Sequence, residues 1–253
     1  MVWGALDGIR GSMTLACSFL NSIRKIDASG RGSIRAIVEN GAATLGKWKG
    51  RWPFDGYAQD SEGRSGVLPA AKDLGRFLDE LATWNAKLDL TAAKGPEELC
   101  DLMLGDACAL AKVLPQGATV IDVGTGAGGP AISLALLRPD LVLTLVEPLA
   151  KRTAFLRTAL AAVGRADVRV VRGRGEDLLT AGERWDVAMS RATLAPPAWL
   201  SLGADLVRPG GTVAVLLAKE AAPDTANATR GNTVHYTLAY SGASRTLALY
   251  TRV

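Results

Sequence analysis

The hydrophobic positions of the chain first follow a helical period. From about Ala70 they recur every three or four residues, which predicts an amphipathic helix whose apolar face holds Leu74, Phe77, Leu78, Leu81 and Trp84. After a break at residues 88–95, Pro96 is suited to the first turn of a second helix that runs to Val113. We therefore expect an α-helical preface over residues 69–115.

From Thr119 the pattern changes to short apolar runs that alternate with helical stretches. Buried strands that lack polar alternation and are separated by helices are typical of a parallel sheet covered on both faces. Two late runs flank a turn at residues 241–244 and predict an antiparallel pair at the end of the sheet. We expect a doubly wound, mostly parallel seven-stranded α/β sheet over residues 116–253. The predicted strands are 119–123, 142–146, 168–171, 185–189, 212–217, 234–240 and 246–251, and the helices are 130–137, 150–163 and 197–207.

Residues 1–68 show neither period. They contain scattered glycine, serine and isolated tryptophans, and the run over residues 56–66 is polar and turn-rich. We place a boundary near Val67, with a disordered or non-native extension before it and one folded domain over residues 69–253.

The charge balance limits the choice of partner. The chain has 29 basic and 25 acidic residues, a net charge of +4; nine and six of these lie in residues 1–68, so 20 and 19 remain in the body. A nearly neutral body is unlike a polycationic nucleic-acid binder, so any RNA contact has to rest on a local basic patch.

The remaining composition argues against metal, disulfide and membrane functions. Three cysteines without paired spacing and a single histidine, His235, favour neither a zinc site nor a disulfide framework. The sequence contains no apolar run of the roughly 20 residues that span a bilayer. The apolar stretch at residues 12–20 is interrupted by polar residues and has no clear cleavage site after it. We expect a cytoplasmic protein with no membrane or metal partner.

The segment Val120-Ile-Asp-Val-Gly-Thr-Gly-Ala-Gly-Gly129 carries the most chemical information. Glycines directly after a buried strand and before a helix let the backbone turn sharply and let a ligand lie against it. Gly124, Gly126 and Gly129 also satisfy the spacing of a dinucleotide fingerprint, so spacing alone does not separate NAD from S-adenosylmethionine.

Acidic residues near this loop favour the second cofactor. Asp122 ends the first strand, where a carboxylate would repel the pyrophosphate of NAD but could accept hydrogen bonds from the methionyl part of a sulfonium cofactor. Glu147 ends the second strand and is suited to bind both ribose hydroxyls, a feature of both cofactor classes. The alternatives are a turn carboxylate for Asp122 and a solvated strand end for Glu147.

Two further segments lie at the ends of later strands. Gly175 and Glu176 follow the third strand, where they could bracket an adenine or form a solvated turn. Arg191 follows the fourth strand, at the carboxyl edge where ligands bind in open α/β sheets. It could hold RNA phosphate, the substrate base or the cofactor carboxylate, and its alternative is a helix-end ion pair. We take Arg191 as the candidate catalytic residue.

Taken together these segments resemble the bacterial 16S ribosomal RNA (guanine-N7) methyltransferase family, RsmG or glucose-inhibited division protein B. The resemblance runs from about Phe77 to the end of the chain. It is carried by Trp84-Asn85, Leu90-Thr91-Ala92, Asp106 with Ala109-Leu110, the glycine loop continued to Pro130, Lys151-Arg152 with Phe155-Leu156, Ser190-Arg191-Ala192 and Ala218-Lys219.

The resemblance implies S-adenosylmethionine as cofactor and 16S rRNA or the 30S subunit as partner, and we expect the chain to act as a monomer. It implies cofactor binding by the loop from Gly124 to Gly129, by Glu147, by Gly175-Glu176 and by Arg191. The chain departs from the usual family pattern at Met103, Gly105, Ala107, Ala127 and Gly129.

The chemistry agrees with guanine N7 as the acceptor. This nitrogen already carries a lone pair and loses no proton on methylation, so a site for it needs alignment and no general base. The chain lacks the Asn/Asp-Pro-Pro-aromatic segment common in adenine-amine methylation, and Cys100 and Cys108 read as core residues. The alternatives are a small-molecule methyltransferase, a NAD-dependent oxidoreductase and a non-catalytic RNA-binding relative.

Overall fold

The computed structural model describes Trp52, Ala58–Gln59, Ser65–Gly66 and residues 70–253. The two short segments form strands β1 and β2, which pair antiparallel. The predicted boundary near Val67, and most of the extension predicted over residues 1–68, lie outside the described residues. The polar, turn-rich run over residues 56–66 thus contains a small β-ladder.

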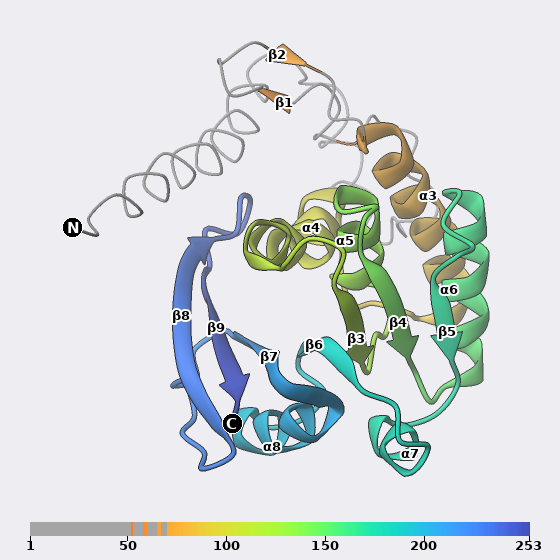
Figure 1. The fold of residues 1–253 in the computed structure, drawn as a ribbon. Coiled ribbons are helices and arrows are strands. Elements are labelled where there is room, and N and C mark those ends of the chain that lie inside the picture. The colour runs from red at the N-terminus through yellow and green to blue at the C-terminus, as the bar shows by residue number, and fades with distance from the viewer. Residues whose placement is uncertain (1–51, 53–57, 60–64, 67–69) are drawn as a thin grey trace.

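The main sheet has seven strands in the order β5-β4-β3-β6-β7-β9-β8 (Figure 1). The pairs from β5 through β7 are parallel, and β9 pairs antiparallel with both β7 and β8. This confirms the predicted mostly parallel seven-stranded sheet with an antiparallel end. The strands are β3 (Thr119–Val123), β4 (Val142–Val146), β5 (Arg169–Val171), β6 (Trp185–Ser190), β7 (Val207–Leu217), β8 (Ala228–Thr237) and β9 (Ser244–Arg252).

In the described part of the chain, six helices cover the two faces of the sheet. Successive residues of a strand point to opposite faces, and neighbours such as Val120 and Ile121 accordingly belong to two different apolar clusters. One cluster contains the helices α3 to α6 and the other contains α7 and α8, which lie at the bottom of Figure 1. The helices are α3 (Ala71–Leu88), α4 (Pro96–Val113), α5 (Ala131–Leu137), α6 (Ala150–Ala162), α7 (Gly175–Thr180) and α8 (Pro196–Leu206).

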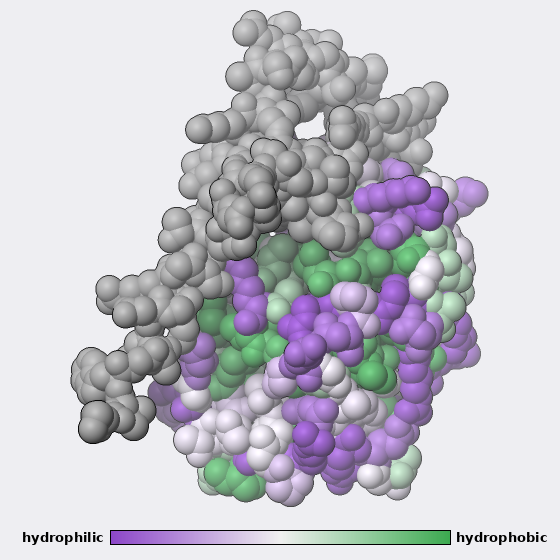
Figure 2. Space-filling model, turned by 45° about the horizontal axis from the view of Figure 1, so that its top comes forward, coloured by the Kyte–Doolittle hydropathy of each residue, from purple (hydrophilic) through white to green (hydrophobic). Residues whose placement is uncertain are grey.

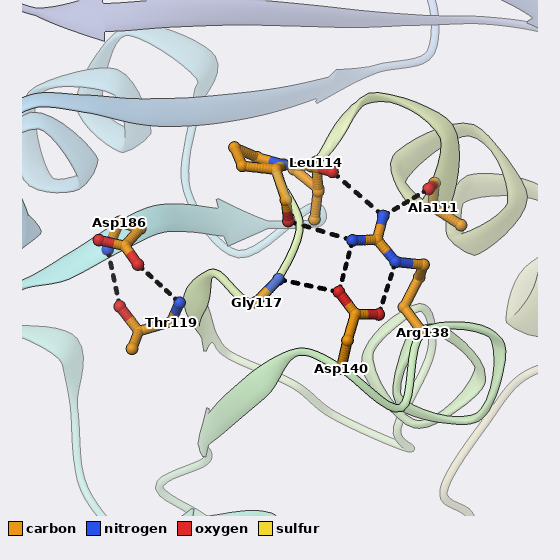
Figure 3. Close-up of polar contacts among 8 residues, drawn as sticks. Ala111, Leu114, Gly117, Thr119, Arg138, Asp140 and Asp186 are labelled. Carbon is orange, nitrogen blue, oxygen red and sulfur yellow. Dashed lines mark hydrogen bonds and ion pairs between the residues drawn. The ribbon is translucent and has the colours of Figure 1, made fainter.

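Polar side chains fix the amino-terminal edge of the sheet. Arg138, at the end of α5, donates to the carbonyls of Ala111, Leu114 and Pro115 and pairs with Asp140 at 2.7 Å (Figure 3). The last carbonyl groups of a helix have no hydrogen-bond partner within the helix. Arg138 supplies partners for these groups at the C-terminal end of α4. The helical preface and the sheet are therefore joined by specific contacts as well as by apolar packing.

The chain also contains elements that the periodicity did not predict. Helix α7 replaces the expected loop because the Asp177 carboxylate accepts the backbone N–H of Arg174 at 2.8 Å and the following Leu178 is buried. Strand β8 begins at Ala228, six residues before the predicted start at Val234. It lies at the edge of the sheet, and after the buried Ala228 its residues 229–232 are exposed, so no apolar alternation marks them.

Trp52 packs against the body. Its side chain is 5% exposed, its indole N–H donates to the Asp79 carboxylate at 2.6 Å, and its ring lies over Gly75. Residues four apart lie on one face of a helix, so both contacts fall on the same side of α3. One residue N-terminal to the predicted boundary thus belongs to the hydrophobic core.

The surface is mixed in polarity. On the face drawn in Figure 2, hydrophilic residues gather in several separate areas with apolar residues between them. Among the described residues, none of the helices combines the length and apolar character needed to cross a membrane.

Candidate functional site

The glycine loop lies between β3 and α5 and is tied to the end of β4. Gly124 and Gly126 have φ angles of +75° and +62°, a left-handed conformation that favours glycine. The backbone N–H groups of Gly124 and Thr125 donate to the Val146 carbonyl at 2.8 and 3.1 Å. The Gly126 N–H donates to the Glu147 carboxylate at 3.0 Å. The loop is therefore held over the carboxyl ends of β3 and β4.

The three predicted glycines serve different purposes. A Cβ at Gly124 would lie 2.2 Å from Thr193 Oγ1, and a Cβ at Gly129 would lie 2.6 Å from the sulfur of Met103. Both positions are closed by protein, so packing accounts for these glycines. At Gly126 the nearest protein atom to such a Cβ is the Gly124 carbonyl oxygen at 3.8 Å. Gly126 is thus the position where the loop faces open space.

Asp122 is a buried carboxylate at the carboxyl end of β3. Its side chain is 2% exposed, and among the described residues its Oδ2 atom has no hydrogen-bond partner. Burial raises the pKa of Asp122 to about 7, against the lowering effects of a Thr125 hydrogen bond and the Arg191 charge. A buried acceptor without a partner costs free energy, so this position suits a cationic or hydrogen-donating ligand.

Glu147 lies beside the loop at the end of β4. Its side chain is 2% exposed, and its two oxygens accept the backbone N–H groups of Gly126 at 3.0 Å and Leu149 at 2.9 Å. A carboxylate has further acceptor sites, so this side chain could also bind two ribose hydroxyls. The solvated strand end considered as an alternative for Glu147 does not describe this buried position.

Gly175 and Glu176 open helix α7 next to β3. Gly175 is buried, and a Cβ there would lie 3.0 Å from the Val123 side chain, so the start of α7 lies close to the glycine loop. Glu176 lies in the first turn of α7 and is exposed. The structure thus brings Gly175 to the loop and leaves the Glu176 side chain accessible to solvent.

Arg191 follows β6 and reaches helix α4. Its guanidinium pairs with Asp106 at 3.2 Å and also donates to the Leu102 carbonyl. Asp106 is buried, and its other oxygen accepts the hydroxyl of Tyr236 from β8. Burial and the neighbouring Asp106 charge raise the pKa of Tyr236, which keeps it a neutral donor. The ion pair considered as an alternative for Arg191 is therefore present, and a quarter of the Arg191 side chain remains exposed.

Tyr236 was missed as a site residue, and Asp106 was noted only as part of the family resemblance. Asp106 and Tyr236 are 130 positions apart in the sequence, so no spacing rule links them. The detectable signal was a carboxylate at an otherwise apolar, buried position of α4.

The end of β6 is fastened to the end of β3. Ser190 Oγ and Thr193 Oγ1 both donate to the Val123 carbonyl, at 2.8 and 3.2 Å. Strand order reverses between β3 and β6, and in open α/β sheets ligands bind outside the carboxyl ends at this point. Asp122, Gly126, Glu147 and Arg191 all lie along this edge. Between residues 70 and 253, three or more metal-ligating side chains do not come together at any point.

Two solved structures share this fold. Cofactor-bound Rv0187 from MTB matches with a TM-score of 0.53 at 19% identity, over 72% of this chain and 89% of that one. An O-methyltransferase from Bacillus cereus in complex with SAH matches with a TM-score of 0.52 at 17% identity, over 70% and 90%. The fold is that of the S-adenosylmethionine-dependent methyltransferases.

Sequence comparison gives the family. The rRNA small subunit methyltransferase G family, GidB, matches residues 70–246. Ribosomal RNA small subunit methyltransferase G from Myxococcus xanthus is 37% identical over 201 residues, which cover 74% of this chain and 92% of that protein. The enzyme of the same name from Anaeromyxobacter dehalogenans is 37% identical over 190 residues, 71% and 87% of the two chains. The chain belongs to this family, which confirms the resemblance found in the sequence and the methyltransferase class over an oxidoreductase.

Proposed function

We propose that this chain transfers a methyl group from S-adenosylmethionine to N7 of a guanine in 16S ribosomal RNA. The observation that carries the proposal is the buried carboxyl edge of the sheet, where an acceptor without a partner, Asp122, and an open glycine position, Gly126, lie beside Glu147. Membership in the rRNA small subunit methyltransferase G family supports the RNA substrate.

Each residue of the edge has a proposed role toward the cofactor. Gly126 leaves room for it, Glu147 accepts the ribose hydroxyls, and Asp122 accepts hydrogen bonds from its methionyl part. Gly124, Gly129, Gly175 and Glu176, the other predicted cofactor residues, give the surrounding loops their shape or border the site. When bound, the cofactor would supply an electrophilic methyl group. The lone pair of N7 would form a bond to the methyl carbon as the carbon–sulfur bond breaks, the sulfur would leave as a neutral thioether, and N7 would lose no proton.

Arg191 is the proposed catalytic residue. Asp106 and the Leu102 carbonyl hold its guanidinium at the carboxyl end of β6, so its exposed part can hold the target nucleotide in line with the methyl group. No general base is needed for N7. His235 fits this reading, since it lies on the edge strand β8 with its ring bonded to Thr246 at 3.0 Å.

The experiment is to incubate 30S subunits and free 16S RNA with labelled cofactor and to map the methylated base. The same experiment shows which of the two partners the protein, expected to be a cytoplasmic monomer, prefers. The acceptor atom is then tested by replacing the target guanine with 7-deazaguanine, which keeps the Watson–Crick face and removes only the nucleophilic nitrogen. Loss of transfer is expected. Continued methylation of that RNA would contradict N7, and labelling of a small molecule alone would favour the small-molecule alternative.

A further inference from the structure

Three arginines stand apart from the others in their bonding. Among the described residues, most arginines reach a carboxylate or a backbone carbonyl. The ion pairs involve Arg76, Arg138, Arg165, Arg169, Arg191, Arg208 and Arg230. Carbonyl bonds hold Arg157, Arg184, Arg245 and Arg252. In this part of the chain, Arg152, Arg172 and Arg174 have neither kind of partner.

These three side chains come from neighbouring elements. Arg152 lies in the first turn of α6, after β4, and Arg172 and Arg174 follow directly after β5. The backbone carbonyl of Glu147 joins the two segments, because it accepts both Thr153 Oγ1 at 3.1 Å and the Gly173 N–H at 3.3 Å. The three arginines therefore flank Glu147 on the β4–β5 side of the site. We call Arg152, Arg172 and Arg174 the arginine rim.

Burial and exposure indicate a ligand that comes from outside. Arg172 and Arg174 are exposed. Arg152 is half-buried, and its buried Nε atom has no hydrogen-bond partner within the described part of the chain. Glu176 and Asp177 follow in the same segment. Neither belongs to an ion pair between described residues, and the Asp177 carboxylate instead accepts the backbone N–H of Arg174 at 2.8 Å. A buried donor without a partner is costly, so a ligand that accepts from Arg152 would gain binding free energy.

The cofactor does not supply the negative charge that the rim requires. The side of the site next to Glu147 is where the ribose is proposed to lie, and the adenosine half of S-adenosylmethionine carries no anionic group. Arginine presents a planar fork of donors that matches phosphate oxygens. A phosphate chain that passes over this side of the site would meet all three guanidinium groups.

We infer that the arginine rim binds the phosphate backbone of the substrate RNA, on the side of the cofactor opposite Arg191. The inference rests on the proposed function for the identity of the nucleic acid. It assigns the local basic patch that a nearly neutral body requires. The RNA would thus be held from two sides, by Arg191 at the target nucleotide and by the rim on neighbouring phosphates.

The test compares two double variants of equal charge. In R172Q/R174Q the rim loses two cations at the carboxyl end of β5. In R169Q/R208Q the chain loses two cations that are paired with Glu183 and Asp186 at the amino-terminal edge. Affinity for a 16S RNA fragment is measured at several salt concentrations, and S-adenosylmethionine affinity is measured in parallel by titration calorimetry.

The rim variant should bind RNA about tenfold more weakly near 0.1 M salt, and its log–log salt slope should be smaller by about 1.5, the value for two lost phosphate contacts. Its cofactor affinity should not change, and the KM for RNA should rise while kcat is kept. R152Q should weaken RNA binding in the same way. The amino-edge variant should bind RNA like the unmodified protein.

Equal losses in both double variants would show a general effect of net charge and would overturn the inference, as would unchanged RNA affinity in R172Q/R174Q. Weaker activity on 30S subunits with unchanged affinity for free RNA would assign the rim to a ribosomal protein and overturn it too. RNA binding is measured here without methyl transfer. Failure of the proposed function, seen as absence of methylation by the unmodified protein, is therefore a separate result.

Discussion

The amino-terminal and carboxyl-terminal edges of the parallel sheet, where its strands begin and end, contain the same types of polar residue. They differ in whether these residues find hydrogen-bond partners within the protein. At the amino-terminal edge the polar groups pair with one another. Asp140 binds both Arg138 and the Gly117 N–H, and Thr119 and Asp186 exchange two hydrogen bonds of 2.8 and 3.0 Å (Figure 3). Nothing in this network requires a ligand.

At the carboxyl edge, some buried polar groups have hydrogen-bonding capacity that the protein does not use. Asp122 Oδ2 and Arg152 Nε have no hydrogen-bond partner among the residues that the structure describes, and Gly126 faces open space there. Buried polar atoms are nearly always paired in native proteins, so two exceptions of opposite charge at this edge indicate function. At the amino-terminal edge the polar groups satisfy one another and contribute to stability. At the carboxyl edge some polar groups are left without protein partners and are available to bind a ligand. Matched substitutions at the two edges can test this difference.

The largest expected effect comes from a pair of glycines at opposite ends of β3. Gly126 and Gly117 have φ angles of +62° and +67°, and in both cases an added Cβ meets no protein atom closer than 3.8 Å. Gly126→Val and Gly117→Val therefore carry a similar backbone strain. Only the first puts a branched side chain where the cofactor is proposed to lie.

Titration calorimetry should show S-adenosylmethionine affinity reduced by about 100-fold in Gly126→Val, in line with the cost of overpacking a filled site. Gly117→Val should bind normally. Both should show a similar decrease in melting temperature. Normal titration heat for Gly126→Val would remove the glycine loop from the cofactor site.

The next effect compares two carboxylates that each accept backbone N–H groups. Glu147→Ala should weaken cofactor binding by about 1.5 to 3 kcal/mol, the value of hydrogen bonds to a charged group. Asp140, whose pKa is lowered first by its hydrogen bond to Arg138, should behave differently. Asp140→Ala should lower the melting temperature and leave cofactor affinity intact. If the two variants bound the cofactor equally well, the proposed difference in function between the two edges would be wrong.

A third variant separates stability from function outside the sheet. Trp52 is buried on α3 and bonded to Asp79, and burying a large apolar side chain contributes about 2 kcal/mol. Trp52→Ala, and a shortened chain that begins at Val67, should both unfold at a lower denaturant concentration while keeping cofactor affinity. The sequence pattern alone predicts that the shortened chain is fully stable. Unchanged midpoints would support that view and make the Trp52 contact energetically neutral.

Buried central strands were predictable from the sequence because two physical signals agree there. The runs at Thr119–Val123 and Val142–Val146 are mostly apolar and β-branched and end at turn residues, and the structure has the same bounds. Helix α7 has six residues, which is too short to display a 3.6-residue period. Isolated contacts such as Trp52 on α3 leave no periodic trace at all.

The site was predictable to the extent that its residues follow one another along the chain. Asp122, the glycine loop and Glu147 occupy the ends of consecutive strands, so the rule for open α/β sheets places them together. The partner of Arg191 comes from α4 and is itself bonded to Tyr236 on the edge strand. Contacts of this kind depend on how the helical preface packs on the sheet, which local patterns do not encode.

The smallest expected effect is a pH dependence of cofactor binding that arises from Asp122. Its pKa is about 7 in the folded chain and 3.8 for an ordinary aspartate, so the folded state binds more protons between these values. The free energy of unfolding of the ligand-free protein should therefore fall as pH rises from about 4 through 7. A cationic ligand prefers the ionised carboxylate, so S-adenosylmethionine affinity should rise over the same range, by up to about tenfold between pH 6 and 8.

Asp122→Asn should abolish both slopes, since the amide does not titrate, and it should raise the melting temperature at pH 8 because an uncompensated buried charge is gone. With the cofactor saturating, kcat of the unmodified protein should stay nearly flat from pH 6 to 9, because N7 gives up no proton. A cofactor affinity that falls with rising pH, or that keeps its slope in Asp122→Asn, would show that the unpaired carboxylate oxygen does not face the cofactor. The unpaired Oδ2 atom of Asp122 would then have no role in ligand binding. The difference between the two edges would be supported only by the glycines and the arginines.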